Sequence, residues 1–153
     1  MNHYTEILNY IKEIGEQDVF VNTVTQGEFD KLDLNKFNVF PLLHASINGA
    51  NFTNGSSVTF NIQLGCFNIR DKNKEINTDK FFNNDNEVDN LNETLAVLNR
   101  TWKIMYKDFN DKGFYASENP TLEPRILDYS NLLDGWILDF EVEMPNNIIS
   151  LCQ

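Results

Sequence analysis

The amino-acid sequence predicts an α+β fold, with a mostly antiparallel β-sheet that contains a long β-hairpin and is packed by one long helix and a short N-terminal helix. Apolar residues recur every three or four positions from residue 88 to residue 109, the spacing of a long amphipathic helix. Apolar and polar residues alternate over residues 58–64 and 136–144, the spacing of half-buried strands. A length of 153 residues, 41% of them hydrophobic, suits a single domain spanning residues 1–153.

The N-terminal part of the chain predicts one short helix and one strand. The apolar residues at helical spacing are Tyr4, Ile7, Leu8, Ile11 and Ile14. Gly15 follows them at a position suited to end the helix. Residues 19–24 are rich in β-branched side chains and predict a strand, whereas residues 26–38 are polar and predict a loop.

The central hairpin is predicted from two apolar segments, residues 40–47 and 58–64. Asn-Gly pairs at residues 48–49 and 54–55 provide turn chemistry, so we expect a loop of about ten residues between the strands. The alternation breaks at Gly65, which predicts a bulge or a bend there.

The long helix has the strongest pattern in the sequence. Its apolar stripe consists of Val88, Leu91, Leu95, Leu98, Trp102, Met105 and Phe109. Asp85 or Asn86 can cap its start, and we expect it to end near Gly113. Such a stripe could also seed a coiled coil, but flanking strand patterns favour packing across the sheet.

The C-terminal part returns to strand character, with a short strand over residues 125–129 and a longer one over residues 136–144. In the longer strand, the apolar residues point to one face and Asp139, Glu141 and Glu143 point to the other, about 6–7 Å apart along the strand. One interpretation is an ordinary solvated face. The other is a surface whose negative potential is useful because it repels DNA.

Apolar residues also occur outside the predicted core. Residues 70–86 form a long polar segment that contains two adjacent phenylalanines, and residues 148–153 form an apolar tail. We expect these residues to contact neighbouring subunits. The candidate contact residues are Phe81, Phe82, Ile148, Ile149 and Leu151.

The composition argues against several classes of function. A formal net charge of −11 disfavours a general nucleic-acid-binding surface, because such binding depends mainly on Lys and Arg. No segment has the roughly 20 consecutive apolar residues that a membrane-spanning helix needs, and the N-terminus does not resemble a signal peptide. We therefore expect a cytoplasmic site of synthesis and no membrane partner.

The sequence gives no pattern for catalysis or for metal binding. His3 and His44 are the only histidines, and neither has the neighbours of a zinc site. Cys66 could contact His44 across strands, but nothing completes a nucleophilic site. The acidic run from residue 71 has Ile76 and Phe82 where a calcium loop needs glycine and glutamate. We expect no enzyme activity, no cofactor and no metal.

The order helix, strand, long hairpin, long helix and two strands resembles that of phage tail-terminator and tail-completion proteins, the small ring subunits of the neck and tail. The resemblance is carried by residues 40–69, residues 87–109 and the ending Asn-Leu-Leu-Asp-Gly-Trp-Ile-Leu-Asp-Phe-Glu-Val-Glu-Met-Pro at residues 131–145. The pattern D-G-W-x-L-x-F-x-V…P looks especially like such proteins of crAss-like phages. The resemblance covers most of the chain and is a pattern of elements without a catalytic signature.

The resemblance implies a structural virion protein of the tail or neck, assembled in the host cytoplasm. Copies of the chain would form a hexameric or dodecameric ring that contacts neighbouring portal and tail ring proteins. Genomic DNA would pass through the lumen without specific binding, and Asp139, Glu141 and Glu143 are the candidate lumen-facing residues. The alternative is an acidic binding module, either a DNA mimic or an inhibitor of a basic host protein.

Overall fold

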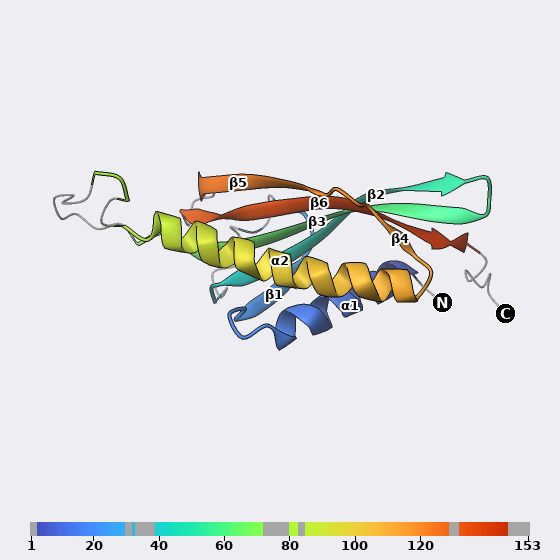
Figure 1. The fold of residues 1–153 in the computed structure, drawn as a ribbon, viewed down its shortest axis with the longest axis horizontal. Helices are drawn as coiled ribbons and strands as arrows, with labels where there is room; N and C mark the ends of the chain where they lie inside the picture. Colours follow the sequence, from blue (N-terminus) through green and yellow to red (C-terminus); the bar gives the residue numbers. More distant parts are fainter. Residues whose placement is uncertain are drawn as a thin grey trace.

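The computed structural model describes residues 3–29, 32, 39–71, 80–82, 85–128 and 132–146. Within these residues, two helices lie on one face of a six-stranded, mostly antiparallel sheet, which confirms the predicted α+β fold (Figure 1). The elements in chain order are α1 (His3–Gln17), β1 (Thr23–Gln26), β2 (Leu42–Thr53), β3 (Ser57–Ile69), α2 (Glu87–Asp111), β4 (Tyr115–Ala116), β5 (Thr121–Asp128) and β6 (Leu133–Pro145).

The strands are arranged in the order β1-β2-β3-β6, and both β4 and β5 pair with the outer edge of β6. β1 runs parallel to β2, whereas the other pairs are antiparallel. The hairpin of β2 and β3 extends beyond the helices at one end of the molecule (Figure 1). Helix α2 runs along the sheet. Helix α1 lies next to α2 on the same face, near β1 and β2.

The predicted hairpin is present, but its loop is shorter than we expected. β2 does not turn at Asn48 and Gly49. It continues past them through a register shift between Ile47 and Gly49, so the extra residue forms a bulge. The turn lies at the second Asn-Gly pair, where Asn54 and Gly55 have φ angles of 50° and 70°.

Two predictions about the N-terminal part were wrong at their boundaries. Gly15 does not end the first helix, because α1 continues to Gln17 and buries Gly15 against the sheet. A Cβ atom at Gly15 would lie 2.7 Å from Val24 and 2.9 Å from Leu43, so glycine permits this close approach. The strand expected from residue 19 begins only at Thr23. Similarly, β5 begins four residues before the expected start at residue 125.

The bulge that we expected at Gly65 is absent from the ladders, because Gly65 pairs in register with His44 and with Ile137. The break in alternation has another cause. Aromatic rings cover Gly65, and a Cβ atom there would lie 2.5 Å from Phe67 and 2.7 Å from Phe29. Glycine therefore makes room for these rings on the sheet face that is opposite to the helices.

Two apolar clusters hold the fold together. The larger fills the space between the sheet and both helices, and includes Ile7, Ile11, Leu64, Leu98, Met105 and Phe140. The smaller lies on the opposite sheet face, at the end where β3 finishes and β6 begins. It consists of Leu32, Leu42, Phe67, Leu133 and Ile137. Neither of the two described helices lies over that second face.

The long helix is present, but it is rotated relative to its predicted stripe. Thr94 and Thr101 are buried against the sheet, and their hydroxyls donate to carbonyls one turn earlier in the helix. Leu91, Leu95 and Trp102 are half-buried on the flank of the helix. Small side chains facing the sheet let the helix approach it closely, which moves the larger ones sideways.

Candidate functional site

The predicted row of carboxylates lies on the sheet face opposite to the two helices. Asp139, Glu141 and Glu143 alternate with the buried residues Phe140 and Val142, so β6 has the predicted two-faced pattern. Asp139 and Glu141 are exposed and Glu143 is half-buried. Side chains at every second position of a strand stand about 6–7 Å apart, so the three charges form a line along β6.

The neighbours of this row are polar but uncharged. The residues that pair with the row from β3 are Gln63, Asn61 and Thr59, and those from β5 and β4 are Thr121 and Tyr115. Among the described side chains, Gln63 is the one that donates a hydrogen bond to the row, over 3.1 Å to Asp139. Within the part of the chain that the structure describes, no Lys or Arg forms an ion pair with these carboxylates.

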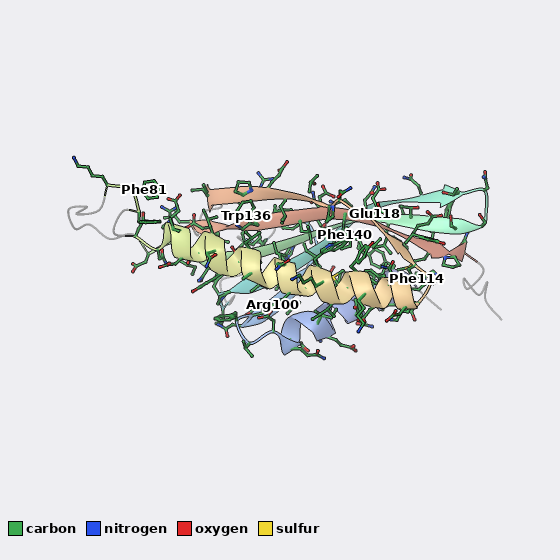
Figure 2. The ribbon with its side chains drawn as sticks, in the orientation of Figure 1. Phe81, Arg100, Phe114, Glu118, Trp136 and Phe140 are labelled. Atoms are coloured by element: carbon green, nitrogen blue, oxygen red, sulfur yellow. The ribbon has the colours of Figure 1, made fainter. Side chains whose placement is uncertain are left out.

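The two adjacent phenylalanines lie at the end of the molecule where α2 begins, and Figure 2 shows Phe81 there. Phe81 is 83% exposed and Phe82 is 51% exposed, which is unusual for side chains of this size. Their rings meet edge to face, with centroids 4.8 Å apart. The other candidate contact residues, Ile148, Ile149 and Leu151, lie outside the described residues.

A buried ionic cluster near the start of α2 was not predicted from the sequence. Arg70 donates to both carboxylate oxygens of Asp134, over 2.5 and 2.9 Å. It also pairs with Asp85 at 3.1 Å and with Glu87 at 2.8 Å. The Arg70 side chain is 6% exposed and that of Asp134 is fully buried. The hydrogen bond to Asp134 raises the pKa of Arg70, against the opposing effect of burial.

The same cluster fixes the first turn of α2. Asn90 donates to Asp134 over 3.3 Å and to the carbonyl of Ile69 over 3.0 Å. Asp85 accepts the backbone N–H of Glu87, whereas the side chain of Asn86 shows no capping hydrogen bond. The positive end of the helix dipole supports the excess of negative charge here. A lone arginine directly after an apolar strand was the only sequence signal for this cluster.

A second ion pair joins α2 to the turn after α1. Arg100 donates to both oxygens of Asp18, over 2.9 and 3.0 Å, and its guanidinium lies over the ring of Phe20. Burial alone would raise the pKa of Asp18, but hydrogen bonds from Arg100 and from the backbone of Phe20 outweigh it and lower the pKa. Figure 2 shows Arg100 near the middle of α2, so this pair positions α1 and does not form part of the acidic face.

His44 and Cys66 do not form a site together. They occupy alternate register positions, since Gly65 pairs with His44 and Cys66 pairs with Leu43, so their side chains project from opposite faces of the sheet. Burial raises the pKa of the Cys66 thiol. His44 Nδ1 is 2.7 Å from the Thr25 hydroxyl, and its Nε2 is 2.9 Å from the carbonyl of Gly27. Both ring nitrogens are therefore engaged in holding β1 to β2.

The described residues contain no group of three or more His, Cys, Asp or Glu side chains that could hold a metal ion. None of the described helices is long and apolar enough to cross a membrane. No protein-family model matches the sequence, and no curated protein matches it. The fold and its surfaces are therefore the basis for a functional proposal.

Proposed function

We propose that the protein is a structural subunit of a ring in the neck or tail of a phage virion, where it joins portal and tail components around a lumen that genomic DNA traverses. The observation behind this proposal is the row formed by Asp139, Glu141 and Glu143. Among the described residues, this row has no ion-pair partner and lies on the sheet face opposite to both helices. Repulsion within a row of like charges weakens the monomer slightly, and a function for the negative potential would offset that cost. Repulsion of DNA phosphates inside a lumen is such a use.

The shape of the molecule and its exposed apolar residues support association between copies. Phe81 and Phe82 lie at one end of the long axis, and the tip of the β2–β3 hairpin lies at the other (Figures 1 and 2). Near that tip, Phe52 is 74% exposed. Different apolar surfaces at opposite ends suit head-to-tail contacts, which form a ring when the rotation between copies closes.

The first experiment is the native mass of the full-length protein, alone and with the portal and tail ring proteins of the same phage. We expect a hexamer or a dodecamer. The variant Phe81→Ser with Phe82→Ser should assemble more weakly, whereas Val88→Ser, which alters an exposed apolar residue on nearby α2, should assemble normally. A protein that stays monomeric in the presence of its neighbouring rings would contradict the proposal.

The second candidate is an acidic binding module that mimics DNA or inhibits a basic host protein, and the same uncompensated row favours it. The triple variant Asp139→Lys, Glu141→Lys, Glu143→Lys separates the two. A ring subunit should still assemble but should now retain duplex DNA at low salt, because its lumen has become basic. A mimic should lose its partner instead. The control with the same charge change, Asp89→Lys, Glu93→Lys, Glu16→Lys, alters exposed residues on the two helices.

A further inference from the structure

The end of β6 lies at an apolar groove that α1 forms with the C-terminal end of α2. The groove has a volume of about 500 Å³ and follows α1 from His3 to Glu13. Met144, near the end of β6, lines it, and the carbonyl oxygen of Pro145 lies 3.2 Å from His3 Nε2. The start of α1 and the end of β6 therefore meet at one end of the groove, and Figure 1 shows both at the same end of the molecule.

The groove favours an apolar occupant. Covering apolar surface contributes roughly 25 cal/mol per Å² removed from water. Figure 2 shows one of the lining rings, Phe114, beside the end of α2. The apolar lining consists of three buried side chains and two half-buried rings, which are Ile7, Phe109, Met144, Tyr10 and Phe114.

One polar atom at the groove lacks a partner, and it needs a donor. His3 is 4% exposed, and its Nε2 donates to the carbonyl of Pro145, since a carbonyl only accepts. In the neutral ring Nδ1 is then an acceptor, and it has no hydrogen-bond partner among the described residues. The carboxylate of Glu6, at 3.4 Å, does not satisfy it because a carboxylate also accepts. A backbone N–H of a peptide in the groove supplies such a donor.

We propose that this groove receives the C-terminal segment of the same copy, residues 147–153, which lies outside the described residues. The segment begins at the groove, because the backbone N–H of Asn146 still donates to the carbonyl of Ser56 over 2.9 Å and holds the preceding residue in place. Its apolar side chains are those that the groove favours, namely Ile148, Ile149 and Leu151.

The segment has to reverse direction after β6 to follow α1. Helix α1 runs opposite to β6, since it starts beside Pro145 and its Gly15 packs against Leu43, near the other end of the sheet. The sequence Pro-Asn-Asn at residues 145–147 suits a reversal at this point. Proline fixes a φ angle that turns use, and asparagine tolerates the left-handed region.

The length of the segment matches that of the groove. The ten helical steps from His3 to Glu13 span about 15 Å. The five residues from Ile148 to Cys152 span roughly 17 Å when extended. With the turn at residues 145–147, this arrangement places Cys152 beside Glu13.

The short connection favours the segment of the same copy over that of another copy. A group on a short flexible linker has an effective concentration in the millimolar range, so at micromolar protein the segment of another copy is about a thousandfold more dilute. In this arrangement Ile148, Ile149 and Leu151 cover their own copy, in place of the contact with a neighbouring subunit that we expected from the sequence. The inference does not depend on the proposed function.

Disulfide formation in full-length variants tests where the segment lies. The chain has two cysteines, and Cys66 is buried with a raised thiol pKa, so Cys152 is the natural thiol that reacts readily. The groove variant is Glu13→Cys, and the matched control is Lys12→Cys. Both positions are exposed on α1, but residue 12 does not line this groove. Each protein is treated with diamide at low micromolar concentration, and the products are separated on a denaturing, non-reducing gel.

We expect the disulfide to form within one chain at least tenfold faster in Glu13→Cys than in Lys12→Cys, because a docked segment holds Cys152 within bonding distance of residue 13 only. Charges on the segment should remove this preference, because they oppose burial in an apolar groove. The variant that tests this adds to Glu13→Cys the substitutions Ile148→Asp, Ile149→Asp and Leu151→Asp.

Two results would overturn the inference. Equal rates in Glu13→Cys and Lys12→Cys would mean that the segment does not occupy the groove. Disulfides formed mainly between chains would mean that the occupant comes from a second copy. Neither result bears on ring assembly, which the native mass of the natural protein measures separately.

Discussion

Buried polar groups have hydrogen-bond partners at one end of the molecule and lack them at the other. At the start of α2, Arg70 satisfies Asp134, and Asn90 completes the network. At the end of β6, His3 and Ser57 each bury a polar atom that has no partner. Both ends join a helix to the long strands of the sheet. The polar groups at the first end are therefore satisfied within the described residues, whereas the second end buries polar atoms that are not.

Polar groups with partners contribute to stability, and polar groups without partners do not. Substitutions at the satisfied end should therefore lower the free energy of unfolding. Substitutions that remove a polar atom without a partner at the other end should change it little.

Removal of Arg70 should destabilise the protein most. The variant Arg70→Met leaves the fully buried carboxylate of Asp134 without its cation, and breaking a buried pair in this way costs about 3–5 kcal/mol. Denaturant unfolding of the variant should show a midpoint far below that of the natural protein. The control Arg125→Met breaks a pair at 3.7 Å whose side chains are 43% and 72% exposed, and should cost less than about 1 kcal/mol. Equal costs for the two variants would refute this role for Arg70.

His44 should have an intermediate effect that depends on pH. The variant His44→Leu removes the partner of the Gly27 carbonyl and of the Thr25 hydroxyl, at a cost of about 1–3 kcal/mol near pH 8. Burial lowers the pKa of His44, although hydrogen bonds to the backbone of Gly27 and Glu28 oppose this effect.

The sign of the pH dependence follows from that shift. The unfolded chain takes up a proton at His44 near pH 6.5, whereas the folded chain does so only at a lower pH. The natural protein should therefore keep its full stability above about pH 6.5 and lose some as the pH falls toward the folded value. Unfolding curves between pH 8 and pH 5 should show this slope, and His44→Leu should reduce it. An unchanged slope in the variant would mean that another group causes it.

The sequence predicted features that depend on residues close together in the chain. The period of β6 placed Asp139, Glu141 and Glu143 on one face, and the structure has them there. The ionic cluster could not be predicted in the same way, because Arg70 and Asp134 are 64 positions apart and meet only after β3 pairs with β6. The hairpin loop was misjudged because an Asn-Gly pair forms a bulge as readily as a turn.

The smallest expected effects concern two buried hydroxyls, that of Thr101, which has a hydrogen-bond partner, and that of Ser57, which has none. Thr101 donates to the carbonyl of Val97 over 2.9 Å, so Thr101→Val should cost about 1 kcal/mol in the free energy of unfolding. Ser57 Oγ has no partner, so Ser57→Ala removes a hydroxyl that gains nothing in an isolated copy, and it should be neutral or slightly stabilising. Both values should be measured at a low protein concentration, which keeps copies apart. A clear loss of stability from Ser57→Ala there would mean that this end is satisfied within one chain.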